Sequence, residues 1–193
     1  MLWVAGVAFV CVALVTLMAS CSFSGPIRSD IRRAEKLAQS DPDQALAILH
    51  SINTSTLKSK AQRAHYALAY CEASYFGREH LESDSLTLIA VEYFEQHGSS
   101  EMSARAHYYH GQVCYNMLRL TDAMVAFMEA ERELRNVDSP HLLGLVHRAK
   151  GDIYGTGCLY RNSYDAYAAS KECFERAGRN DEVEHSVDKI GRT

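Results

Sequence analysis

Apolar residues recur at helical spacing along most of this chain. Ile31, Ala34 and Ala38 lie three and four residues apart, which is the spacing of one face of an α-helix. The same pattern returns over residues 182–190, where we predict a short last helix that covers the exposed end of the preceding helices. The alternative is that this helix is the first of a repeat that the chain does not complete. No stretch reads as a strand, so the pattern predicts an all-α protein.

Breaks in this pattern divide the chain into about four pairs of helices. Asp41 and Pro42 end one helix and begin the next, because Asp caps helix N-termini and Pro suits the first helical turn. Gly98 and Gly178 each follow a Phe-Glu-x-x segment and are predicted helix stops. Residues 139–140, Ser-Pro, open the fourth pair.

The third pair has a small, small, large, small pattern that the fourth pair repeats. In the third pair the pattern is Gly111, Ala123, Phe127, Ala130, and in the fourth pair it is Gly151, Ser163, Tyr167, Ser170, at the same spacing. Small residues at these places allow two helices to cross closely. Self-similarity at this period predicts stacked helix pairs, in which a surface rather than a catalytic centre performs the function.

A second repeated string suggests an alignment of the second and third pairs. Residues 63–66 read Arg-Ala-His-Tyr, and residues 105–108 read the same. We take these strings as equivalent positions of two first helices. This alignment places Ala69 opposite Gly111.

Residues 104–130 resemble a tetratricopeptide repeat (TPR), and the resemblance extends over roughly residues 28–178. Gly111 matches the small residue of the first helix, and the second helix supplies its partners. The repeat is longer than the usual one of this family, and His107 and His147 replace the Trp often found early in the first helix. The resemblance implies a solenoid domain over residues 28–193, with about four helix pairs, a capping helix and a concave groove lined by first helices.

The resemblance also implies which side chains line that groove. They are Arg63, Tyr66, Tyr70, Arg105, Tyr108, Gln112, Tyr115, Asn116, Arg148, Asp152 and Thr156. Arginine forks bind carboxylates at two points, and tyrosines give rigid contacts. The expected ligand is therefore a protein or peptide segment, with acidic groups. The alternative is that the tyrosines pack between helices and the arginines are solvated.

The first twenty residues form a separate, uncharged segment. Residues 17–21, Leu-Met-Ala-Ser-Cys, resemble a lipobox, in which the signal peptide is removed and Cys21 carries the lipid. Residues 21–27 are a predicted tether. An uncleaved transmembrane anchor and a buried helix are the alternatives. We expect a lipid-anchored protein of the bacterial cell envelope that faces the periplasm.

The remaining chemistry is sparse. Four cysteines lie beyond the leader and the lipidation position, and none has the CxxC spacing of a zinc site: Cys71, Cys114, Cys158, Cys173. We expect small buried thiols, with a Cys158–Cys173 disulfide left open. His107 and His110 lie one helical turn apart but lack an acidic or Cys ligand at motif spacing. We therefore expect no metal and no cofactor.

These patterns favour a non-catalytic function. The formal net charge is −4 without long runs of one sign, which argues against nucleic acid as a partner. No nucleophile motif or phosphate-binding loop is recognisable. We predict a membrane-tethered scaffold for protein–protein interactions. The alternative is the sensory part of a membrane-anchored regulator whose output domain is absent from this chain.

Overall fold

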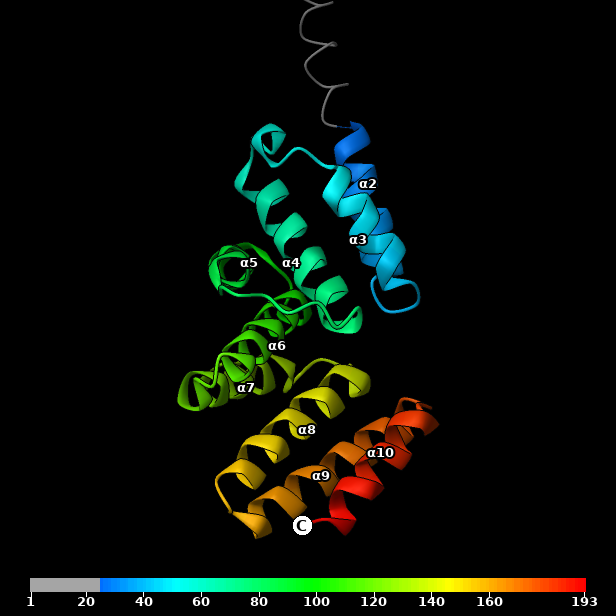
Figure 1. The fold of residues 1–193 in the computed structure, drawn as a ribbon, viewed down its shortest axis with the longest axis vertical. Helices are drawn as coiled ribbons and strands as arrows, with labels where there is room; N and C mark the ends of the chain where they lie inside the picture. The colour runs from blue at the N-terminus through cyan, green and yellow to red at the C-terminus, as the bar shows by residue number, and fades with distance from the viewer. Residues whose placement is uncertain (1–24) are drawn as a thin grey trace, which may run out of the picture.

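A computed structural model describes residues 25–193, and over this range the chain is helical without a strand (Figure 1). One short 3-10 helix, η1, spans Thr54–Thr56. The α-helices are α2 (Gly25–Leu37), α3 (Pro42–Ser51), α4 (Lys60–Phe76), α5 (Ser85–His97), α6 (Ser100–Asn116), α7 (Leu120–Leu134), α8 (Pro140–Thr156), α9 (Tyr160–Arg176) and α10 (Asn180–Gly191). The prediction of an all-α fold is confirmed.

The predicted N-terminal anchor and the lipid-bearing Cys21 lie outside the described residues. Residues 25–27, the end of the predicted tether, belong to α2. Among the described helices, none is long and apolar enough to cross a membrane.

Each helix packs against the next along the chain, and the even-numbered helices also contact one another. α2 contacts α4, α4 contacts α6, and α6 contacts α8. Figure 1 shows the succession from α2 at the top to α10 at the bottom. The even-numbered helices therefore form a continuous row, and a surface along this row draws on several helices.

The row has a constant period in the sequence. α4, α6 and α8 have the same length and begin at Lys60, Ser100 and Pro140. Each of these helices therefore begins forty residues after the previous one in the row. The position before each of them is a serine: Ser59, Ser99 and Ser139. Serine is favoured at this position because its hydroxyl can accept a hydrogen bond from the first turn, as Ser59 does from Gln62 N and Ser99 from Met102 N.

α4, α6 and α8 also end with the same backbone conformation and the same hydrogen bond. Arg78, Leu118 and Cys158 are left-handed, with φ of 58°, 61° and 58°. The following amide donates to the carbonyl five residues back each time, as Arg119 N does to Cys114 O at 2.9 Å. This hydrogen bond is the signature of a Schellman ending.

The glycine positions allow the close helix crossings that the sequence pattern predicts. A Cβ on Gly111 would lie 2.5 Å from the ring of Phe127, and a Cβ on Gly151 would lie 2.6 Å from the ring of Tyr167. Phe127 is fully buried and Tyr167 nearly so. The missing side chains thus make room for aromatic rings.

The α4/α5 pair departs from this arrangement. Its positions equivalent to Gly111 and Phe127, one period earlier, hold Cys71 and Thr87, and both are buried. α5 also begins at Ser85, later than the period requires, since α7 begins at Leu120. A small polar side chain thus takes the place of the ring.

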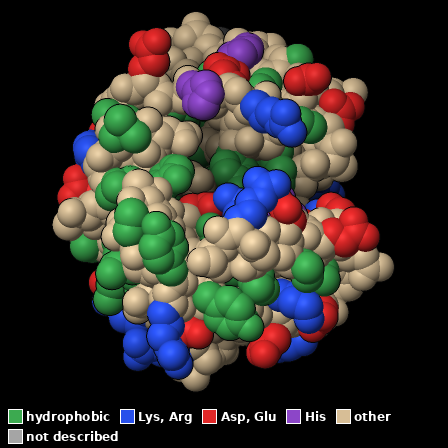
Figure 2. Space-filling model, turned by 60° about the horizontal axis from the view of Figure 1, so that its bottom comes forward, with side chains coloured by type: hydrophobic (Ala, Val, Ile, Leu, Met, Phe, Trp, Pro, Cys, Tyr) green, Lys and Arg blue, Asp and Glu red, His purple; other side chains and the backbone are tan. Residues whose placement is uncertain are grey.

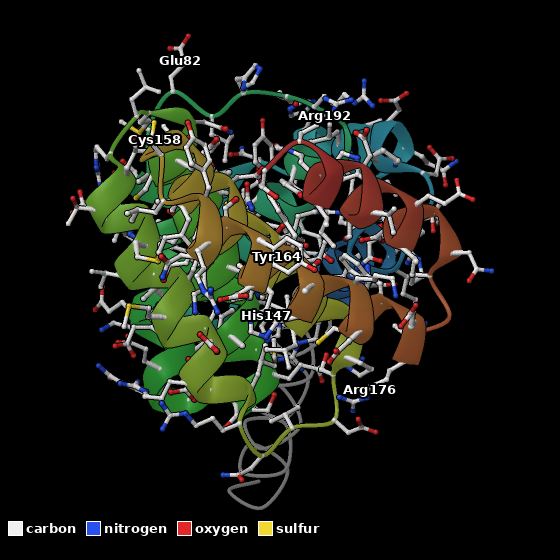
Figure 3. All side chains as sticks on the ribbon, turned by 90° about the horizontal axis from the view of Figure 1, so that it is seen from below. Glu82, His147, Cys158, Tyr164, Arg176 and Arg192 are labelled. Carbon is white, nitrogen blue, oxygen red and sulfur yellow. The ribbon has the colours of Figure 1, made fainter. Side chains whose placement is uncertain are left out.

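The four cysteines of the described residues are free. Cys71, Cys114 and Cys173 are buried and Cys158 is exposed. Cys158 precedes α9 and Cys173 lies near its other end, about 22 Å away at 1.5 Å per residue. Figure 3 shows Cys158 and Arg176, which follows Cys173 by three positions, on opposite sides of the molecule. A disulfide between Cys158 and Cys173 is excluded in this arrangement.

Candidate functional site: a groove across the even-numbered helices

A groove of about 500 Å³ crosses the row of even-numbered helices. It draws side chains from α2, α4, α6 and α8, which lie far apart in the sequence. The lining residues are Glu35, Lys36, Gln39, Ser40, Glu72, Glu101, Arg105, Tyr109, Ser139, His141, Leu142 and Leu145. A groove shared by four successive helices of the row is suited to an extended ligand.

A buried ion pair lies in the lining of this groove. Glu72 is only 2% exposed, and Arg105 donates a hydrogen bond to its Oε2. Gln39 Nε2 donates to the other oxygen, Oε1, at 3.0 Å. A buried carboxylate is tolerated when it is paired and hydrogen-bonded in this way. The pair links α4 and α6, and Gln39 ties the end of α2 to it, where the groove crosses these helices.

The protonation of these groups follows from the pair. Burial lowers the pKa of Arg105, but the charge of Glu72, the charges of Tyr109 and Glu35 and the hydrogen bond to Glu72 together outweigh it, so that this pKa is raised. Burial, and then the charge of Glu72, raise the pKa of Tyr109 well above its usual value. Arg105 is therefore a fixed cation and Tyr109 a neutral hydroxyl.

The other charged lining groups are more accessible. Glu35 lies 3.1 Å from the imidazole of His65, and Glu101 accepts a hydrogen bond from Ser139. Lys36 and Glu101 are exposed. On the molecular face drawn in Figure 2, basic side chains likewise lie beside acidic ones.

The last helix, α10, covers Arg148 of α8. Arg148 lies 5.2 Å from the ring centroid of Phe174 and donates to Glu182 of α10 at 3.3 Å. His141 Nε2 lies 2.9 Å from the other Glu182 oxygen. Burial raises the pKa of Glu182. The hydrogen bond and charge of His141 and the charges of Arg148 and Arg179 lower it by more, so the pKa of Glu182 is lowered overall.

Of the predicted groove residues, Arg105 alone lines this groove. Tyr108 is fully buried, and its hydroxyl donates to Tyr75 Oη at 2.9 Å. Its pKa is raised well above the usual value, chiefly by burial. The expectation that Tyr108 faces a ligand is wrong, because Tyr108 fills space between helices. Arg148 is only 16% exposed under Glu182.

The predicted residues of α4 lie elsewhere because their alignment was wrong. The helix starts at Lys60 and Ser100 make Arg105 equivalent to His65 and not to Arg63. A slip of two residues turns a helical position by about 200°, to the opposite face. Arg63 accordingly donates to the carbonyl of Leu57 at 3.0 Å, outside the groove.

The two tyrosines predicted with Arg63 also fail to reach the groove. Tyr66 is buried and stacks on Tyr70, with ring centroids 5.9 Å apart. The Tyr70 hydroxyl donates to Glu79 at 3.2 Å.

The remaining predicted residues of α6 and α8 are dispersed. Gln112 and Asn116 line a small pocket beside Cys71, and half-buried Tyr115 packs against the core. Asp152 accepts hydrogen bonds from Tyr167 at 2.8 Å and Lys189 at 2.6 Å. Thr156 is exposed.

Sequence reasoning missed Glu72 and Tyr109. The repeat period contains a usable signal, since Glu72, Gln112 and Asp152 are equivalent and all polar. A polar column in otherwise apolar helices marks positions that face solvent or a groove.

The two histidines considered as a metal pair have separate partners. His107 Nε2 lies 3.0 Å from Glu95, whereas His110 Nδ1 lies 2.9 Å from the Thr87 hydroxyl. His110 belongs instead to a cluster with Asp84 and Cys114, away from the groove.

Comparison of the chain with protein-family models, with curated proteins and with solved structures found no match. The groove and its chemistry therefore carry the functional argument.

Proposed function

We propose that this chain is a TPR-like solenoid whose groove holds an extended segment of a partner protein without catalysing a reaction. The observation that carries the proposal is the groove of about 500 Å³ lined by four successive even-numbered helices. The constant period of α4, α6 and α8 supports the solenoid part. Clefts that expose polar groups from several repeats suit peptide recognition.

The charges of the groove favour a basic segment over the acidic one expected from the sequence. Nη2 of Arg105 already donates to Glu72, and the carboxylate of Glu72 offsets the charge that Arg105 offers to a partner carboxylate. The other charged lining residues are Glu35, Glu101 and Lys36, an excess of one negative charge. A Lys or Arg of the partner would complement this excess.

The groove chemistry favours binding over catalysis. The most buried carboxylate, that of Glu72, has both oxygens engaged by Gln39 and Arg105. A group held in this way is poorly placed to accept a proton from a substrate.

Membrane tethering is the second part of the proposal. Its support is the uncharged segment and the lipobox resemblance at residues 17–21. Trp3 is the only tryptophan, so removal of the leader abolishes tryptophan fluorescence. We expect the membrane-extracted protein to lack this fluorescence and to carry lipid mass on Cys21. Persistence of Trp3 would contradict cleavage.

The binding part can be tested by charge reversal in the groove. The full chain captures partners from a lysate, and the same capture is repeated with the double variant Glu35→Lys/Glu101→Lys. Glu172→Lys, at an exposed position of α9, is the control. We expect the double variant to lose the partner, the control to keep it, and capture to weaken with salt.

Helical content by circular dichroism checks that both variants are folded. Undiminished capture by the folded double variant would exclude this groove as the binding surface.

A further inference from the structure

Three side chains with metal-binding chemistry meet between α5 and α6. Asp84 precedes α5, and His110 and Cys114 lie one turn apart on α6. One ligand atom from each lies within 4.8 Å of the other two. None of the three lines the groove described above, so the cluster needs its own explanation.

The spacing of the two α6 ligands fits a tetrahedral metal. His110 Nε2 and Cys114 Sγ are 3.6 Å apart. Zinc bonds of about 2.3 Å to sulfur and 2.0–2.1 Å to nitrogen, at a tetrahedral angle, separate these two atoms by about 3.6 Å. The helix therefore already holds this pair at the required distance.

A buried threonine sets the imidazole in the form that a metal needs. The Thr87 hydroxyl donates to the Asp84 carbonyl at 2.8 Å, so its oxygen is left to accept from His110 Nδ1 at 2.9 Å. The proton then resides on Nδ1, and the Nε2 lone pair points toward Cys114. Such an outer hydrogen bond is typical of ligating histidines.

We propose that Asp84, His110 and Cys114 bind one divalent cation of the zinc class. The carboxylate, imidazole and thiolate are three ligands that zinc accepts, and water supplies the fourth. The Cys114 thiol loses its proton to solvent as the sulfur–metal bond forms. This inference does not depend on the proposed binding function of the groove.

The guanidinium of Arg119 contacts two of the three side chains. Its guanidinium donates to Asp84 at 2.8 Å and to Cys114 Sγ at 3.2 Å, and its Nε donates to Asp122 at 2.8 Å. The side chain is 38% exposed and Asp122 is 57% exposed. On metal binding Arg119 releases Asp84 and Cys114 and keeps Asp122.

This site could not be predicted from the sequence, because its ligands do not form a contiguous motif. The cysteine lacks a CxxC partner, and the acidic ligand comes from the preceding helix pair. The late start of α5 brings Asp84 to the site, and the substitution of a ring by Thr87 supplies the outer hydrogen bond.

Cobalt titration of the full chain tests the proposal, because thiolate-bound Co²⁺ has an intense near-ultraviolet charge-transfer absorption. We expect one equivalent to produce this absorption and zinc to displace it. Cys114→Ser and His110→Gln should abolish it, and Asp84→Asn should weaken binding at least tenfold. Cys158→Ser, which removes an exposed thiol that is not part of the cluster, is the control and should bind as the parent does.

Arg119→Gln distinguishes a metal site from a merely structural cluster. Removal of the competing guanidinium should tighten cobalt binding about tenfold, whereas loss of a structural ion pair would not. Circular dichroism confirms that each variant is folded. Persistence of the absorption in Cys114→Ser, or unchanged affinity in Arg119→Gln, would overturn the proposal.

Discussion

The α6/α7 and α4/α5 pairs follow the same repeat period but differ in the side chains that fill the crossing of their two helices. In α6/α7 the ring of Phe127 fills the space left by Gly111. In α4/α5 the equivalent residues are Cys71 and Thr87, and the Thr87 hydroxyl contacts His110 of the next pair. The ring stabilises a crossing within one pair, whereas the small polar residue connects one pair to the next.

Truncation of Phe127 and of Thr87, one at a time, should give the largest difference in the free energy of unfolding. Phe127→Ala should lower the free energy of unfolding by about 3–5 kcal/mol, because a fully buried ring is lost and a cavity remains. Thr87→Ala should cost only about 1–2 kcal/mol, from the unpaired imidazole. Urea unfolding followed by circular dichroism measures both, and equal losses would refute the difference in roles.

The polar column of Glu72, Gln112 and Asp152 on the even-numbered helices provides the next contrast. Glu72→Gln should cost about 3 kcal/mol, because Arg105 keeps a partly buried charge without its counterion. The equivalent Gln112→Ala, at a half-buried position of α6, should cost less than about 1 kcal/mol.

A paired substitution checks the origin of that loss. Glu72→Met/Arg105→Met removes both charges and should recover most of the stability in urea unfolding. If the double variant is less stable than Glu72→Gln, the ion-pair explanation fails.

A single methyl group tests the glycine crossing. Gly111→Ala should destabilise by about 1 kcal/mol, since overpacking against Phe127 exceeds the usual helical advantage of alanine over glycine. Gly191→Ala, where the new Cβ would have no atom within 4 Å apart from its chain neighbours and its own helix backbone, is the control and should be neutral or slightly stabilising. Thermal melts measure both changes, and a stabilised Gly111→Ala would show that the crossing has slack.

The smallest expected effect is the share of the pH dependence of stability that His147 contributes. Burial lowers the pKa of His147 below 6.5, and Lys150 adds to this whereas Glu131 opposes it. The folded state therefore binds this proton less readily than the unfolded state. Its stabilising contribution is complete above about pH 6.5 and is lost as pH falls through the lowered pKa.

His147→Gln should flatten the fall in stability between about pH 6.5 and 5 by on the order of 1 kcal/mol or less. Unfolding at several pH values, normalised at pH 8, measures this. The α4 equivalent is Ala67, which cannot titrate. An unchanged slope would assign the pH dependence to other groups.

Local signals in the sequence predicted the helices and their crossings well. Asp41 caps α3 by accepting from Gln44 N at 3.0 Å, as its position before Pro42 indicated. Gly111 and Phe127 meet as the small and large pattern required. These features depend on neighbours one turn or one hairpin away, so sequence spacing is sufficient to predict them.

The groove could not be predicted in the same way. The repeated Arg-Ala-His-Tyr string aligned Arg63 with Arg105, although the cap serines Ser59 and Ser99 set a register that is shorter by two positions. Caps fix where a helix begins, whereas a four-residue match on a helix face has no such physical anchor. The burial of Glu72 depends on Gln39, which follows α2, and Arg105 of α6 together, which no local pattern encodes.

The shared beginnings and left-handed endings of α4, α6 and α8 make the repeat a unit for protein engineering. Residues 99–138 start at a cap serine and end just before the next one, so a second copy can be inserted between residues 138 and 139 in register. Such a copy places Phe127 on its own Gly111 and adds one helix to the even-numbered row. The length of the surface offered to a ligand thus becomes adjustable in steps of one repeat, independently of the chemistry at either end.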